Sequence, residues 1–169
     1  MPMENAMSVQ RLSACLYEEK LLLEELLFKL EEEQLILVSG RHRWLERATA
    51  EVENVLRTIN SMESTRIDIM VGVAEELGLD AGAQATMSEV AEAVGEPWSE
   101  VLLGSRESMK ALMSQITRMI AGNRDLITRG LASTTELLVA LGVSAGVAYG
   151  PDGESKPVAG LAKLVDASI

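Results

Sequence analysis

The chain has few aromatic residues, one cysteine, one histidine and four prolines among its 169 residues. Aromatic side chains make up 3% of the sequence, although hydrophobic residues make up 47%. The apolar content is therefore leucine, valine, isoleucine, methionine and alanine, a set that suits helices better than aromatic-rich sheets. This composition predicts long helices that pack along aliphatic seams within a single domain.

The scarcity of metal ligands and nucleophiles argues against catalysis. Cys15 is the single cysteine and cannot form a disulfide within the chain, and His42 has no second histidine or cysteine pair nearby for a zinc site. Glu31, Glu32 and Glu33 follow one another on a predicted helix, where neighbouring side chains point about 100° apart and cannot converge on one ion. We interpret that run as solvated surface, and we predict no enzyme, no cofactor and no metal.

Positive charge is also in deficit, because 15 basic residues face 26 acidic ones and give a net charge of -11. Such a surface repels nucleic-acid phosphates and anionic lipid headgroups. The longest uncharged stretch, 137–151, contains three glycines and is shorter than the roughly 18 apolar residues that span a bilayer. The charged first turns are unlike a signal peptide. We expect a cytoplasmic protein with no nucleic-acid partner and no stable membrane insertion.

What the sequence does contain is a leucine-rich heptad pattern. Alternate steps of four and three give a seam in which six of eight positions are leucine: Leu12, Leu16, Glu19, Leu23, Leu26, Leu30, Glu33 and Leu37. A second seam with the same period follows: Leu45, Ala48, Val52, Val55, Ile59, Met62, Arg66, Ile69 and Val73. The two seams predict helices over 8–39 and 43–77. Ser39-Gly40 between them favours an antiparallel hairpin, with one bent helix as the alternative.

The rest of the chain predicts a short helix, a third long helix and a tail. Thr86 and Glu89 have the spacing of a capping box, which predicts a short helix over 86–94. Pro97 suits the first position of a long helix over 97–141. Residues 142–169 contain repeated glycine and no sustained period, and we expect a flexible tail. The predicted fold is all-α: an elongated bundle of three long helices and one short helix in a single domain, 1–141.

The segments 31–35, 123–127 and 149–153 together resemble the FlgN family of flagellar export chaperones. The first is Glu31-Glu32-Glu33-Gln34-Leu35, near the end of the first helix and followed by the seam that contains Arg66. The second is Asn123-Arg124-Asp125-Leu126-Ile127 in the last helix, and the third is Tyr149-Gly150-Pro151-Asp152-Gly153, similar to the Tyr-Gly-x-Asp-Gly turn of the family's C-terminal tail. The order and spacing of these segments cover about residues 8 to 155.

The resemblance implies a chaperone for hook-associated proteins, which form the hook–filament junction. Such a chaperone binds the C-terminal amphipathic helix of its client, keeps the client unassembled and delivers it to the cytoplasmic domain of the export gate. The client-binding residues that it suggests here are Ile116, Met119, Ile120, Asn123, Leu126, Ile127 and Leu131. The suggested export-gate contacts are Tyr149, Gly150, Asp152 and Gly153.

Two alternatives remain open at this level. The leucine seam of the first helix is sufficient for a self-associating coiled-coil protein with no client, and a homo-oligomer is possible in either case. Asn123 either sets the register of a bound helix or is a satisfied polar residue inside the bundle.

Overall fold

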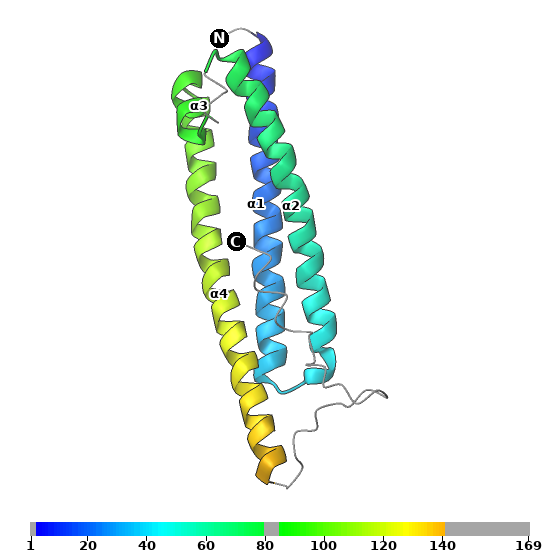
Figure 1. Cartoon of the computed structure of the whole chain (residues 1–169). Coiled ribbons are helices and arrows are strands. Elements are labelled where there is room, and N and C mark those ends of the chain that lie inside the picture. The colour runs from blue at the N-terminus through cyan, green and yellow to red at the C-terminus, as the bar shows by residue number, and fades with distance from the viewer. Residues whose placement is uncertain (1–2, 80–84, 141–169) are drawn as a thin grey trace, which may run out of the picture. The chain divides into compact units, whose positions relative to one another are not determined.

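The computed structural model describes residues 3–79 and 85–140, and every regular element in these ranges is a helix. The elements are α1 (Met3–Val38), the 3-10 helix η1 (His42–Trp44), α2 (Leu45–Glu76), α3 (Met87–Val94) and α4 (Trp98–Ala140) (Figure 1). The predicted all-α bundle is confirmed, and α1 begins earlier than its sequence pattern indicated. The chain divides into two compact units, 1–126 and 127–169. The predicted tail lies outside the described residues.

Helices α1 and α2 form an antiparallel hairpin and lie side by side over their length (Figure 1). Gly40 adopts φ +66° at the end of α1. Its amide donates to the carbonyl of Leu37 at 3.3 Å, and the amide of Arg41 donates to the carbonyl of Ile36 at 3.3 Å. These two bonds are the Schellman arrangement, which closes a helix on a left-handed glycine. The break at Ser39-Gly40 is therefore a full turn.

A left-handed glycine closes the end of α2, and a capping box closes the start of α3. Gly78 has φ +71°, and the amide of Leu79 donates to the carbonyl of Ala74 at 2.9 Å. The predicted capping box begins α3: the amide of Glu89 donates to Thr86 Oγ1 at 3.3 Å, and the amide of Thr86 donates to Glu89 Oε2 at 2.6 Å. The bond from the Thr86 amide holds the pKa of Glu89 below its ordinary value.

The leucine seam of α1 is buried inside its own chain. Its leucines from Leu12 to Leu30 are at most 3% exposed. One core cluster joins all four α-helices through Val9, Leu12, Leu16, Val73, Val90, Ala91 and Leu102. A second joins α1, α2 and α4 through Leu23, Leu26, Leu30, Val52, Val55 and Ile116. Because the seam packs within the chain, it is not free to form a coiled coil with another copy.

An ion pair occupies the seam between the two clusters. Arg66 Nε lies 2.8 Å from Glu19 Oε2, and the Glu19 carboxylate is 7% exposed. Burial raises the pKa of Glu19, and the adjacent guanidinium of Arg66 opposes that rise. Cys15 lies one turn away, with its Sγ 3.7 Å from Met62 Sδ. A buried ion pair of this kind contributes more to the register of α1 against α2 than to net stability.

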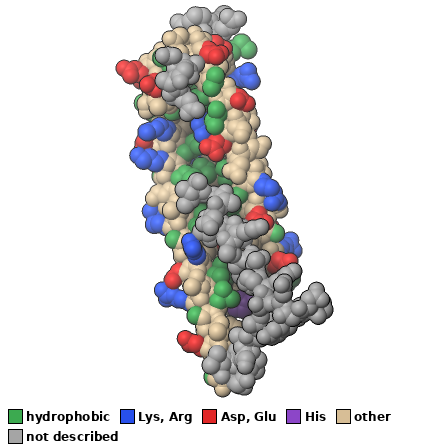
Figure 2. Space-filling model, in the orientation of Figure 1, with side chains coloured by type: hydrophobic (Ala, Val, Ile, Leu, Met, Phe, Trp, Pro, Cys, Tyr) green, Lys and Arg blue, Asp and Glu red, His purple; other side chains and the backbone are tan. Residues whose placement is uncertain are grey.

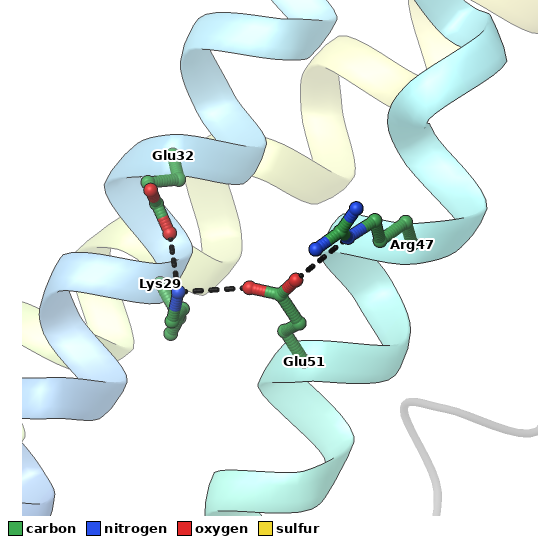
Figure 3. Close-up of polar contacts among 4 residues, drawn as sticks. All are labelled: Lys29, Glu32, Arg47 and Glu51. Carbon is green, nitrogen blue, oxygen red and sulfur yellow. Dashed lines mark hydrogen bonds and ion pairs between the residues drawn. The ribbon is translucent and has the colours of Figure 1, made fainter.

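A chain of charged residues joins the two helices near the turn (Figure 3). Lys29 Nζ lies 2.8 Å from carboxylate oxygens of both Glu32 and Glu51, and Arg47 Nε lies 3.0 Å from Glu51. Hydrogen bonds from Lys29, and next from Arg47, hold the pKa of Glu51 below its ordinary value. The pKa of Lys29 is raised by its bonds to Glu32 and Glu51. Because these side chains are partly solvated, their ion pairs add little to the free energy of unfolding. We assign them a role in selecting how α1 pairs with α2.

Candidate functional site

Helix α4 carries apolar side chains on two faces. Within the first unit, Leu102 and Ile116 are 0% and 3% exposed and belong to the core clusters. Met113 and Ile120 are 48% and 41% exposed. One face of α4 therefore packs against α1 and α2, and another presents apolar surface to solvent.

The predicted client-binding residues of the first unit divide between these two faces. Ile116 is part of the core, and Met119 is half-buried against the second cluster. Leu126 is half-buried, and Ile120 is exposed. Ile120 is thus partly exposed to solvent, while Ile116, one turn earlier on α4, packs in the core.

Asn123 is committed to the interior of the bundle. It is 3% exposed, and its Nδ2 donates to the carbonyl of Leu30 at 2.9 Å and to Glu33 Oε2 at 3.0 Å. Thr49 Oγ1 donates to the other oxygen of Glu33 at 2.8 Å. The three side chains join α1, α2 and α4 in one polar layer. Of the two interpretations of Asn123, the structure therefore favours a polar residue inside the bundle, whose Nδ2 is satisfied within the chain and whose Oδ1 accepts no hydrogen bond from the described residues.

This layer corrects the prediction that Glu31-Glu32-Glu33 is solvated throughout. Glu31 is exposed and Glu32 is half-buried, but Glu33 is only 7% exposed. The prediction was wrong for Glu33 because it rested on the run of glutamates. The heptad position of Glu33 was the signal for burial, since a seam position points to the neighbouring helices whatever residue occupies it.

An apolar strip remains open along this face of the bundle. Figure 2 shows hydrophobic side chains gathered along the middle of the face, with charged side chains toward its edges. Half-buried residues of α2 and α4 pack against the second cluster without closing it: Leu56, Ile59, Met109, Leu112 and Met119. Leu56 was not among the predicted seam residues. It lies three residues before Ile59, and this spacing was the signal that α2 has a wider apolar face.

The described part of the second unit is the end of α4. Ile127 is half-buried, and Leu131 and Leu137 are 54% and 60% exposed. The hydroxyls of Thr134 and Thr135 donate to helix carbonyls four residues earlier, at 2.9 Å each. Leu131 thus presents an apolar side chain, as its predicted role requires. Tyr149, Gly150, Asp152 and Gly153 lie outside the described residues.

Cys15 and His42 lie on different elements of the described chain, α1 and η1. Burial, and next the charge of Glu19, raises the pKa of the Cys15 thiol above its ordinary value. His42 is exposed in η1. Among residues 3–79 and 85–140, no three histidine, cysteine, aspartate or glutamate side chains are grouped to hold a metal ion. In the same ranges, no helix is both long and apolar enough to cross a bilayer.

In its described residues the chain is an all-helical bundle with exposed apolar side chains on α4. The FlgN protein family model matches residues 3–157, and the chain therefore belongs to the FlgN family. This confirms the resemblance seen in the sequence. Neither the curated proteins nor the solved structures contain a significant match. The family implies a role as a flagellar export chaperone for hook-associated proteins.

Proposed function

We propose that this protein holds the C-terminal amphipathic helix of a hook-associated protein, prevents its premature assembly, and delivers it to the export gate in the cytoplasm. The observation that carries the proposal is the apolar surface of α4, where Ile120 and Leu131 are 41% and 54% exposed in a family of export chaperones. Apolar side chains left exposed along one helix can serve as anchors for a partner helix.

The recognition mode that fits this surface is a helix lying on a helix. A client helix would present apolar anchors at three- and four-residue spacing. Complete burial of an isoleucine or leucine contributes about 1.5–3 kcal/mol, so burying the exposed half of Ile120 or Leu131 contributes about 1 kcal/mol each. Because micromolar affinity requires about 8 kcal/mol, several further anchors must take part. Met119, Leu126 and Ile127 are half-buried and complete the proposed set.

Ile116 and Asn123 have a different role in this proposal. Both are 3% exposed, and the amide of Asn123 already bonds to α1. We assign them to holding α4 in register so that the exposed anchors face the client. The buried Oδ1 of Asn123 accepts no hydrogen bond from the described residues.

Client binding is tested by placing charge on the proposed surface. Changing Ile120 and Ile127 together to Asp should weaken capture of a hook-associated protein more than tenfold in a pull-down, because an unpaired carboxylate opposes an apolar contact. The matched control is Val71→Asp, since Val71 is 42% exposed on α2. Helical content should be unchanged by circular dichroism in both proteins. Unchanged capture by the folded Ile120/Ile127 variant would remove the client site from α4.

Delivery to the gate is tested separately at Tyr149. A Tyr149→Ala protein should still capture its client and should fail to bind the cytoplasmic domain of the export gate. If the Tyr149→Ala protein exports its client at the wild-type level, the assignment of the gate contact to residues 149–153 is wrong.

A further inference from the structure

Helix α1 has a second apolar stripe that neither core cluster uses. Met7, Ala14, Leu21, Phe28 and Leu35 follow one another at intervals of seven residues. With Tyr17 and Val38 they form what we call the outer stripe. At about 100° per residue, the outer stripe lies about 170° around α1 from the leucine seam. It therefore faces away from the bundle core.

The outer stripe is exposed along its whole length. The exposed fractions of its large side chains range from 45% to 69%: Met7 66%, Tyr17 61%, Leu21 45%, Phe28 55%, Leu35 69% and Val38 69%. Single exposed apolar residues need no explanation, but a contiguous heptad series marks an interaction surface. The stripe is also distinct from the α4 residues proposed to bind the client.

Charges beside the outer stripe are separated along the helix. Arg11 and Lys20 accompany its first half, where Glu18 is the acidic exception. The second half is flanked mainly by the glutamates Glu24, Glu25, Glu31 and Glu32. Lys29 is its basic exception, with Nζ 5.4 Å from the centre of the Phe28 ring and 2.8 Å from Glu32. A parallel pair of such helices would place glutamates against glutamates, whereas an antiparallel pair places the basic half against the acidic half.

We propose that the outer stripe binds the outer stripe of a second copy of this chain, with the two α1 helices antiparallel. A two-fold axis near Leu21 places Ala14 opposite Phe28 of the second copy, because both lie seven residues from Leu21. The small side chain thus faces the large one. Arg11 and Glu31 lie ten residues from Leu21 on either side and are likewise opposed. The pair of Ala14 and Phe28 is complementary in size and that of Arg11 and Glu31 in charge, whereas Glu18 and Glu24, each three residues from Leu21, are an unfavourable pair.

The area that the outer stripe can bury indicates whether this dimer is permanent or transient. From Met7 to Val38 it is about 45 Å long at about 1.5 Å per residue, and paired helices contact over a width of about 10 Å. The two copies together would bury roughly 900 Å², which is below the roughly 1,200 Å² of a stable interface. We therefore expect a weak, reversible dimer rather than a permanent one.

Sedimentation equilibrium of the full chain between about 1 and 200 μM tests the proposal. The average mass should rise from 18.3 kDa toward twice that value as concentration increases. Phe28→Glu should weaken self-association at least tenfold, and Ile67→Glu, at a residue 47% exposed on α2, should not. A wild-type chain that stays at 18.3 kDa throughout, or equal association by Phe28→Glu, would overturn the proposal.

A charge exchange tests the antiparallel orientation. Arg11→Glu and Glu31→Arg should each weaken the dimer, and the double variant should restore it, because the opposed charges are then exchanged. In a parallel pair each position meets its own copy, and the double variant would stay weak, which would refute the orientation. A monomeric wild type that instead binds a lysine-rich amphipathic peptide through Phe28 would assign the stripe to another partner and overturn self-pairing.

This inference does not depend on the proposed function. Phe28→Glu should still capture the hook-associated protein, and the Ile120/Ile127 variant should still self-associate. The client site on α4 is therefore tested by the Ile120/Ile127 variant, and self-association through the outer stripe is tested by Phe28→Glu. If Phe28→Glu loses client capture as well as self-association, the separation of the two surfaces is wrong.

Discussion

Breaking the polar layer around Asn123 should produce a large loss of stability. In Asn123→Leu, the hydrogen bonds to Leu30 and Glu33 disappear, and the carboxylate of Glu33 stays buried with Thr49 as its remaining partner in the layer. A neutral hydrogen bond contributes about 1 kcal/mol and one to a charged group about 1.5–3 kcal/mol. After allowance for the apolar contact that leucine gains, we expect a loss of about 2–3 kcal/mol.

The second half of this prediction concerns the double variant. Replacing both members of a buried polar pair by apolar groups is far less damaging than replacing one, because no buried charge is left without its partner. Asn123→Leu with Glu33→Leu should therefore lose less stability than the two single changes added together. We expect a coupling free energy of about 1–2 kcal/mol, within the range of contacting polar pairs.

The assay is urea unfolding followed by far-ultraviolet circular dichroism for the four proteins of the cycle, with free energies from linear extrapolation. The slope with urea should be equal in all four, so that the midpoints report stability. The reasoning fails if Asn123→Leu costs less than about 0.5 kcal/mol. It also fails if the single losses add, because the contact between Asn123 and Glu33 then contributes no energy of its own.

Two further predictions concern single sites. Burial raises the pKa of Glu19, so the folded state keeps the carboxyl proton to a higher pH than the unfolded chain does. Between the ordinary and the raised pKa, the free energy of unfolding should therefore fall as pH rises. Glu19→Gln should flatten this dependence, as measured by urea titrations at several pH values. Gly40 has φ +66°, and Gly104 is helical with open space around it. In urea unfolding, Gly40→Ala should lower the free energy of unfolding by about 1 kcal/mol. Gly104→Ala should raise it by about 0.5–1 kcal/mol.

Each of these has its own contrary outcome. A steeper pH dependence in Glu19→Gln would mean that burial does not dominate the Glu19 carboxylate. Equal effects of alanine at Gly40 and Gly104 would mean that backbone conformation does not distinguish the two glycines.

The periodicity of the sequence was sufficient to predict the first two long helices and the seam residues that share one face of each, and it favoured a hairpin over one bent helix. Leu12, Leu16, Leu23, Leu26 and Leu30 repeat with a period that only a helix can place on one face, so their burial follows from local geometry. The same local logic located the turn at Gly40 and the capping box of Thr86 and Glu89. Each of these features depends on residues only a few positions apart.

Other features depend on residues far apart, and only the tertiary structure decided them. Glu19 and Arg66 could be placed on the seams from the sequence, but their pairing depends on the register of α1 against α2. Glu33 was assigned to solvent from its neighbours, and its burial became evident once Asn123 of α4 was seen beside it.

Exposure could not be read from the sequence either. The outer stripe has a heptad period as regular as that of the leucine seam, and periodicity does not state which of two stripes the bundle covers. Which stripe is buried depends on how much apolar surface α2 and α4 present to it. The chain buries the leucine seam because α2 and α4 present matching aliphatic faces to it, and the outer stripe is left exposed on the opposite side of α1.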